Sequence, residues 1–476
     1  MNIDEYVKLD GLALGKLVRK GDVTAADLAA CAQQVIAALN PHINAVIETY
    51  TDRGAPPQPT GPFAGVPFLV KDVGVAPAGA RRECGSRIGE GATATHDCAL
   101  LDRFRTAGFQ IIGRTTAPEM AFNVTTENLL HGPTRNPWDL SRSPGGSSGG
   151  AAAAVAAGMV PVAEANDGGG SIRIPASCCG VFGLKPGRGR VSAAPDAWEY
   201  LNGLSAAHVV SRSVRDSAAA LDAIQGPEPG DPYIIAPPTR SYLNEVARPP
   251  EPLRIALMTT PWNGGKVDAD CIRAAIEAAD LCETLGHRVE EDAPALGVDW
   301  PGFVEANARI WCTNIARMVD ALAIETGRQI SPDTLEATTL ACYEYGKRLS
   351  AGELLGALDI CNMVSRSVGD FFTRHDMLLT PTLPLPPQPL GTYDANQGGL
   401  DALGWTSRLF EASPFTPIFN VTGQPAMSVP LAMSRHGLPL GVQFAARMNR
   451  EDLLFRLAGQ LEQATPWAMR YPPRMG

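Results

Sequence analysis

SPGGSSGGAAAAVAAGMVPVAEANDGGGSIRIPASCCGVFGLKP, residues 143–186, holds two serines in glycine-rich surroundings. Ser147 lies within GGSSGG at 145–150, and Ser171 ends the run DGGGS at 167–171. Glycine tolerates positive φ and lets other groups approach the backbone closely. The two clusters therefore predict backbone loops that converge on a small polar target, and these are the surroundings that a catalytic serine needs.

Three other interpretations of this segment fit its residues less well. A flexible Gly/Ser linker is solvated, but Ala, Val, Met and Pro predominate between the clusters, a composition typical of a core. A phosphate-binding P-loop requires Gly-x-x-x-x-Gly-Lys-Ser/Thr, whereas alanines follow Gly150. A dinucleotide fingerprint is absent as well, since no Gly-x-Gly-x-x-Gly opens a helix with an acidic residue about 20 positions further on.

At these residues the chain resembles the amidase signature family of serine hydrolases. The resemblance covers nearly the whole chain and rests on five stretches: GGSSGG at 145–150, DGGGSIRIP at 167–175, CGVFGLKP at 179–186, GPFAGVPFLVKD at 61–72 and FNVTGQPAMSVP at 419–430. The two serines are 24 positions apart, which also fits. The resemblance implies an α/β fold with a large mixed β-sheet core covered by helices on both faces. It also implies hydrolysis through an acyl-enzyme, with no cofactor.

The resemblance assigns Ser171 as nucleophile, Ser147 as proton relay and Lys71 as base. A serine hydroxyl is a weak nucleophile at neutral pH, so a base must lie within hydrogen-bond reach, directly or through a relay. Lys71 ends an apolar run in which side chains alternate faces, so Asp72 points the other way. We therefore expect no carboxylate on the face of Lys71, and apolar surroundings that lower its pKa.

The remaining site residues support this trio. Consecutive backbone N–H groups are expected to hold the oxyanion, those of Gly168, Gly169, Gly170 and Ser171. The resemblance implies an ion pair between Asp167 and Arg173 that braces the loop, a cis peptide bond between Gly146 and Ser147, and a supporting hydrogen bond from Ser148. Two positions depart from the commonest family pattern, Asn166 in place of Thr and Gly168 in place of a bulkier residue.

The substrate pocket is expected to prefer neutral, largely apolar groups. The loop 120–131 is mostly apolar and is predicted to bring Ala121, Phe122 and Asn123 to the substrate, and Gly168 is predicted to leave room beside the nucleophile. The region 302–410 matches the family least. Its aromatic side chains either cover the cleft or belong to the core: Trp311, Trp405 and Phe410.

Two enzymatic functions within the family stay open. The favoured one is an amidase of aryl, alkyl or cyclic amides, with aryl carbamates and esters as further substrates. The stretches at 61–72 and 166–177, together with TTAPEM at 115–120, TRNPW at 134–138 and REDLL at 450–454, are similar to 6-aminohexanoate cyclic dimer hydrolases and to bacterial aryl acylamidases and urethane-cleaving amidases. The alternative is the glutaminase (A) subunit of a tRNA-dependent amidotransferase, whose pocket needs fixed charges that the loop 120–131 lacks. The intact Lys71, Ser147 and Ser171 disfavour a non-catalytic scaffold.

Composition limits the remaining possibilities. With 40 Lys and Arg against 50 Asp and Glu, the net charge is −10, and no basic patch predicts nucleic-acid binding. The N-terminus has no secretory signal, and the apolar run 151–163 is too short for a membrane span, so we expect a cytoplasmic protein that does not bind membranes. Ten scattered cysteines and seven dispersed histidines predict reduced thiols and no metal site. The expected partners are a small-molecule amide and water, and a homodimer stays open.

Alternating apolar runs and helical periodicities predict one α/β domain over 1–476, with a mainly helical region at 302–410. A capping box at Thr24 opens a helix that is expected to end at Asn40-Pro41. The segments 53–62 and 225–252 are predicted to be loops. Strands are expected at 66–71, 109–113, 254–258, 376–379, 426–431 and 441–446, and further helices at 97–107 and 450–463.

Overall fold

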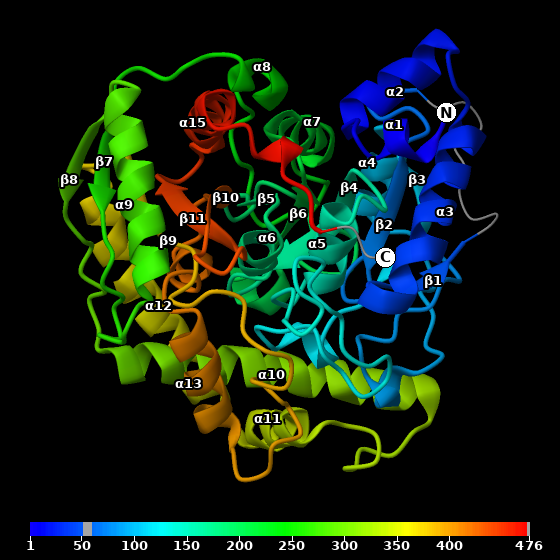
Figure 1. Cartoon of the computed structure of the whole chain (residues 1–476). Helices are drawn as coiled ribbons and strands as arrows, with labels where there is room; N and C mark the ends of the chain where they lie inside the picture. Colours follow the sequence, from blue (N-terminus) through cyan, green and yellow to red (C-terminus); the bar gives the residue numbers. More distant parts are fainter. Residues whose placement is uncertain (51–59, 474–476) are drawn as a thin grey trace.

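The computed structural model describes residues 1–50 and 60–473, and its centre is an 11-stranded sheet (Figure 1). The strands lie in the order β1-β3-β2-β4-β6-β5-β10-β11-β9-β7-β8. Neighbours pair in parallel where β2 meets β3 and β4 and where β7 meets β8 and β9; the other pairs are antiparallel, so the sheet is mixed as predicted. The strand bounds are β1 Val46–Thr49, β2 Pro67–Lys71, β3 Gln110–Thr115, β4 Val162–Asp167, β5 Phe182–Lys185, β6 Ala206–Ser211, β7 Arg254–Leu257, β8 Arg288–Glu291, β9 Met377–Pro381, β10 Ala426–Met433 and β11 Pro439–Ala446.

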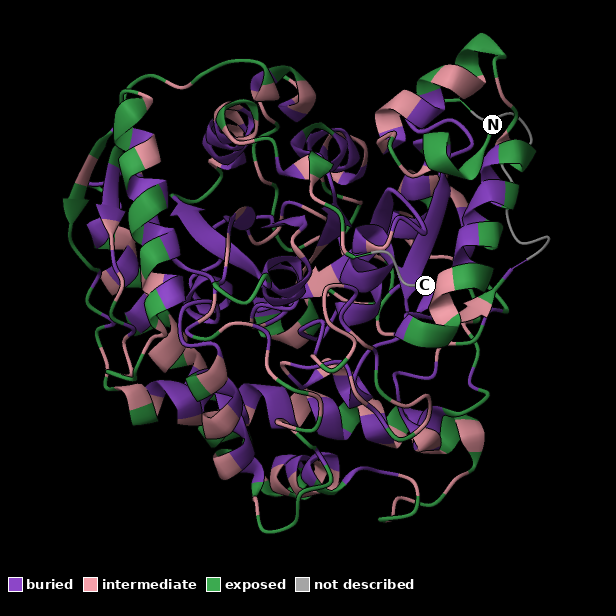
Figure 2. Cartoon of the chain, viewed as in Figure 1, coloured by how far each residue is buried: buried purple, intermediate pink, exposed green. Residues whose placement is uncertain are grey.

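Helices cover both faces of this sheet, as expected. The alternation along β9 shows it, because Met377 and Leu379 belong to one hydrophobic core and Leu378 belongs to another. The first core includes side chains of α3 Ala25–Ile43, α5 Gly149–Ala156, α7 Val214–Ile224, α9 Ala269–Thr284 and α15 Glu451–Ala464. The second core includes side chains of α10 Trp300–Thr326, α11 Ala337–Arg348, α12 Ala351–Phe371 and α13 Ala402–Ala412. Figure 1 shows α10 running across the bottom of the view, and Figure 2 shows that the central strands are buried while outer helices alternate between buried and exposed residues.

Shorter helices complete the part of the chain that the structure describes. They are α1 Ile3–Tyr6, α2 Gly11–Lys20, α4 Ala99–Thr106, α6 Arg173–Cys179, α8 Tyr242–Val246 and α14 Ile418–Val421, with short 3-10 turns at Arg87–Gly89, Glu119–Ala121, Tyr200–Gly203 and Trp467–Met469. Within residues 1–50 and 60–473, no helix has the length and apolar character needed to cross a membrane.

The helix that begins after Thr24 is longer than predicted. It continues through Pro41 to Ile43 and ends at Asn44, whose φ is 56°. Pro41 lies in the last turn, where its missing N–H costs the helix one backbone hydrogen bond. The side chain of Asn40 stabilises the segment that follows the helix, since its Oδ1 accepts hydrogen bonds from the N–H groups of Ala45 and Val46, each at 2.8 Å. The prediction that Asn40-Pro41 ends the helix is therefore wrong.

The predicted strands at 66–71, 109–113, 254–258, 376–379, 426–431 and 441–446 are found with small shifts at their ends, and so are both predicted helices. The region 302–410 is mainly helical, as expected, although β9 lies within it. The segment 225–252 is not all loop, because α8 forms within it. The predicted loop 53–62 lies outside the described residues up to position 59.

Candidate active site

Lys71 is the last residue of β2, and its side chain is buried in the sheet. Its Nζ lies 2.8 Å from Ser147 Oγ, 2.9 Å from Ser148 Oγ and 2.7 Å from Asn166 Oδ1. Both serines immediately precede α5, and Asn166 belongs to β4, the strand that pairs in parallel with β2. The structure thus brings Lys71, Ser147 and Ser148 together as predicted. The Gly146–Ser147 peptide bond is cis, as the resemblance implied.

Ser171 lies in the turn between β4 and α6, and it lines the same cavity as Ser147. Its Oγ has no hydrogen-bond partner among the described residues, so the relay contact expected between Ser147 and Ser171 is not formed in this structure. Hydrogen bonds of a catalytic site are often long without substrate and tighten when it binds. The positions of the two serines therefore remain compatible with a relay.

The loop before Ser171 is held by the carboxylate of Asp167. Arg173 donates to both of its oxygens at 2.9 Å, and neither side chain of this ion pair is exposed, so the predicted ion pair is confirmed. The N–H of Gly170 donates to Asp167 Oδ1 at 2.7 Å. Gly170 is therefore not available to an oxyanion, and its predicted role is wrong. Of the backbone N–H groups of residues 168–171, those of Gly168, Gly169 and Ser171 have no hydrogen-bond partner among the described residues.

The surroundings of Lys71 differ from the prediction in one respect. Glu164 of β4 is fully buried, and its Oε2 accepts the backbone N–H of Lys71 at 2.8 Å. A carboxyl group thus lies beside Lys71, brought there by the pairing of β2 with β4 rather than by the alternation along β2. Asp72 points elsewhere, as expected, and pairs with Arg114.

Burial shifts the pKa values of Lys71 and Glu164 in opposite directions. It lowers the pKa of Lys71 to about 7, against the fields of Glu164 and Asp167, which favour the charged amine. It raises the pKa of Glu164, against the hydrogen bond and the charge of Lys71. The predicted lowering of the Lys71 pKa is therefore supported, and its cause is burial.

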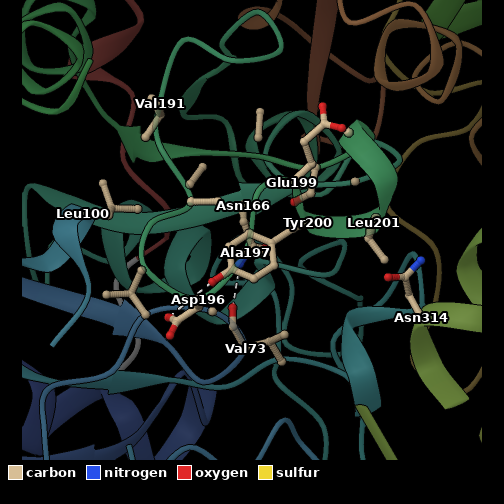
Figure 3. Close-up of a pocket in the computed structure, with 18 of the residues that line it drawn as sticks. Val73, Leu100, Asn166, Val191, Asp196, Ala197, Glu199, Tyr200, Leu201 and Asn314 are labelled. Atoms are coloured by element: carbon tan, nitrogen blue, oxygen red, sulfur yellow. Dashed lines mark hydrogen bonds between the residues drawn. The ribbon is translucent and has the colours of Figure 1, made fainter. Parts of the chain in front are cut away.

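The cavity that Ser147 and Ser171 line has a volume of about 480 Å³. Figure 3 shows other side chains that surround it, among them Val73, Leu100, Val191 and Leu201. A Cβ added to Gly168 would lie 2.7 Å from Leu201 Cδ1 and 2.9 Å from Trp311 Cζ2. These two side chains fill the space that the missing side chain leaves, so the prediction of extra room at Gly168 is wrong. Side chains on the cavity wall include those of Val73, Leu100, Met120, Ala121, Val191, Tyr200, Leu201 and Trp311.

Two of the three predicted pocket residues do not line this cavity. Met120 and Ala121 have φ of 52° and 57°, a left-handed turn that leaves Ala121 on the cavity wall. Phe122 stacks on Trp311 with ring centroids 4.6 Å apart. Asn123 Nδ2 donates to the carbonyl oxygen of Tyr393 at 3.0 Å.

The three aromatic side chains singled out in 302–410 also differ in their location. Trp311 of α10 lines the cavity, whereas Trp405 and Phe410 of α13 lie in the second hydrophobic core. Trp405 Nε1 donates to the carbonyl oxygen of Phe122 at 3.3 Å, so it supports the pocket loop from behind. Trp311 belongs to the second hydrophobic core as well, so it is both a core residue and part of the cavity wall, whereas Trp405 and Phe410 are core residues only.

No group of three or more His, Cys, Asp or Glu side chains able to hold a metal ion occurs within residues 1–50 and 60–473. The cysteines of the described chain are unpaired, and most are buried.

Comparison with known proteins places this arrangement in a family. The sequence matches the family Amidase over residues 25–455. It is 38% identical over 482 residues to the 6-aminohexanoate-cyclic-dimer hydrolase of Paenarthrobacter ureafaciens, covering 97% of this chain and 96% of that protein. A solved 6-aminohexanoate cyclic dimer hydrolase has a TM-score of 0.93 at 37% identity, covering 98% of this chain and 99% of that one. A bacterial aryl acylamidase of the amidase signature family has a TM-score of 0.86 at 25% identity, covering 98% and 97%. The chain therefore belongs to the amidase family, enzymes that hydrolyse carbon–nitrogen bonds other than peptide bonds.

Proposed function

We propose that this amidase hydrolyses neutral, largely apolar amides through Lys71, Ser147 and Ser171, with an acyl-enzyme on Ser171. Aryl, alkyl and cyclic amides belong to this class. Aryl carbamates and esters are proposed as further substrates, because their cleavage also forms an oxyanion. The observation that carries the proposal is the buried Lys71 Nζ, 2.8 Å from Ser147 Oγ, at a cavity that Ser171 also lines.

The hydrogen bonds around Nζ support a neutral amine as the base. Asn166 Oδ1 can only accept, and Asn166 Nδ2 donates to the carbonyl oxygen of Val73 at 2.6 Å, which fixes this orientation. Ser148 Oγ donates its own hydrogen to the carbonyl oxygen of Asn166 at 3.2 Å, so it also accepts from Nζ. A neutral amine has two N–H groups, which these two oxygens take up. Its lone pair is then directed at the Ser147 hydroxyl.

The proposed steps follow from this orientation. Lys71 accepts the proton of Ser147 while Ser147 takes that of Ser171, and Ser171 Oγ attacks the carbonyl carbon. The free N–H groups of Gly168, Gly169 and Ser171 stabilise the oxyanion. The C–N bond breaks as the proton returns through Ser147 to the leaving nitrogen. Water then cleaves the ester by the same route, and the acid is released.

The cavity supports a neutral substrate of some size. Its volume of about 480 Å³ is within the range of small-molecule sites. Beside Gly168 the wall consists of Leu201 and Trp311. The guanidinium of Arg188 also reaches the lining, but it donates to backbone carbonyl oxygens, including that of Gly203 at 2.7 Å. Other charged side chains also line the cavity, among them Arg82, Asp196, Glu199 and Arg317, so the preference for a neutral substrate over glutamine rests on the apolar wall beside Gly168.

We also propose that residues 1–476 work as one amidase domain, in which the region 302–410 covers the cleft. Support comes from α10, which packs in the second hydrophobic core and contributes Trp311 and Asn314 to the cavity wall. Figure 3 shows Asn314 close to Leu201 at one side of the cavity. The helical region and the sheet thus share one binding site.

A substrate panel tests the proposed function. We expect kcat/KM for 4-nitroacetanilide to exceed the values for acetamide and for glutamine more than tenfold, and Ser171→Ala to abolish turnover with an unchanged melting temperature. A tenfold preference for glutamine or acetamide would instead identify a glutaminase or a narrow primary-amide enzyme. Turnover by the Ser171→Ala variant at a tenth of the wild-type rate would exclude Ser171 as nucleophile.

A further inference from the structure

A second titratable group lies beside Lys71, and the proposed steps do not use it. The side chain of Glu164 is fully buried at the junction of β4 and β2, and it contributes to the cavity lining. Its Oε2 accepts the backbone N–H of Lys71 at 2.8 Å, whereas its Oε1 has no hydrogen-bond partner among the described residues. A buried carboxyl oxygen without a partner is costly, so its presence at this place needs an explanation.

The hydrogen bond to the backbone does not supply that explanation. A glutamine side chain has the same length and the same carbonyl acceptor, and it brings no ionisable group into the interior. What a carboxyl group adds is a charge that changes with pH, placed where its field acts on the Lys71 amine.

We propose that Glu164 is a positioning residue for amide hydrolysis, which sets the pH range in which Lys71 is a base. The inference rests on the proposed function, because it requires that Lys71 accept a proton. An ionised Glu164 favours the ammonium form of Lys71 and delays its deprotonation to higher pH. The same charge strengthens Lys71 as a base when the proton arrives from Ser147. Glu164 therefore tunes the base without contacting the substrate carbonyl.

The other titratable groups around this pair do not replace Glu164. Asp167 also favours the charged form of Lys71, but its carboxylate is shared with Arg173 in the buried ion pair. Cys98 lies in the fields of Asp196 and Glu164, and burial raises its pKa, so it stays a neutral thiol. The charged group whose field acts on Glu164 is Lys71 itself.

The test is the pH dependence of kcat/KM for 4-nitroacetanilide in Glu164→Gln and Glu164→Asp. Glutamine keeps the acceptor for the Lys71 N–H but carries no charge, so the ascending limb should move to lower pH by about one to two units. Aspartate keeps the charge, so its limb should stay within about half a unit of the wild type. Glu462→Gln is the matched control. Glu462 also accepts a backbone N–H, that of Val214 at 3.0 Å, and burial raises its pKa, but it is not among the residues that line the cavity and does not act on Lys71, so the ascending limb of its pH profile should coincide with that of the wild type.

The rate of inactivation by a sulfonyl fluoride gives a second readout, because it reports the nucleophile without turnover and should show the same shift. The proposal would be overturned if the ascending limb of the pH profile did not move in a folded Glu164→Gln variant. It would also be overturned if this limb shifted equally in Glu164→Gln and Glu164→Asp. Should thermal unfolding show that the Gln variant does not fold, a downward shift of one unit or more in the Asp variant would overturn it as well. If Ser171→Ala is inactive and the Gln limb does not move, the Glu164 proposal alone fails. Turnover by Ser171→Ala would contradict the proposed function itself.

Discussion

Replacing Gly168 by alanine should destabilise the protein and distort the wall beside the serines. The new Cβ would lie 2.7 Å from Leu201 Cδ1, and 2.9 and 3.0 Å from Cζ2 and Cη2 of Trp311. The end of Leu201 can shift, but Trp311 is only 5% exposed and stacks on Phe122 with ring centroids 4.6 Å apart. Because movement of Trp311 also disturbs Phe122, we expect the usual cost of overpacking, about 1–3 kcal/mol.

Thermal unfolding and steady-state kinetics measure the two consequences. Gly168→Ala should lower the melting temperature by roughly 2–6 °C and lower kcat/KM for an aryl amide more than for acetamide. Gly169→Ala is the matched control for stability, because its Cβ would meet Trp311 Cζ2 at 3.9 Å, an ordinary contact. Adding Leu201→Ala to Gly168→Ala removes the nearest clash and should restore part of the loss. Equal melting temperatures for the two single alanine variants would refute the reasoning.

Two further predictions concern charged groups of the site. Because burial lowers the pKa of Lys71 to about 7, wild-type kcat/KM should rise with pH through this value. The variant Lys71→Met should lose several orders of magnitude in kcat. A pH profile that is flat from about pH 5 to 9 would argue against a lysine base. Burial alone would raise the pKa of Asp167, but Arg173 holds it well below its ordinary value of 3.8, so the stability from this ion pair is present above that pH and is lost as the pH falls further. Asp167→Asn leaves Arg173 buried without its charge partner and should cost about 3–5 kcal/mol. The difference in melting temperature from the wild type should be constant between about pH 5 and 8 and narrow below about pH 4, and a difference independent of pH would contradict this.

The strands that could be predicted from the sequence are short apolar runs buried on both faces, such as those of β2 and β9. The same criterion missed β4, because Glu164 and Asn166 interrupt its apolar residues. Glu164 and Asn166 are stabilised there by hydrogen bonds with Lys71 and Val73, at and just after the end of β2, and no local sequence pattern contains these contacts. The strand β8, with the sequence RVEE at the sheet edge, is mostly exposed and has no apolar run to detect.

In the site, the glycine clusters indicated Ser147 and Ser171 as candidate catalytic serines, and the resemblance assigned the roles of these two serines and of Lys71. Asn166 carried a signal, since it departs from the commonest family pattern, and its contact with Nζ gives that departure a structural role. Glu164 had no such signal, because its place beside Lys71 depends on strand pairing. Trp311 of α10 fills the space beside Gly168. The two residues are far apart in the sequence, so no local pattern could predict this contact.

The most direct test of the central claim is to trap the nucleophile covalently and locate the adduct. The enzyme is incubated with a fluorophosphonate or an arylsulfonyl fluoride, digested, and mapped by mass spectrometry, with Ser171→Ala and Lys71→Met treated in parallel. We predict one adduct, on Ser171, that is absent from Ser171→Ala and forms much more slowly in Lys71→Met. An adduct on Ser147 or Ser148, or one that persists in Ser171→Ala, would contradict the proposed roles of the three residues.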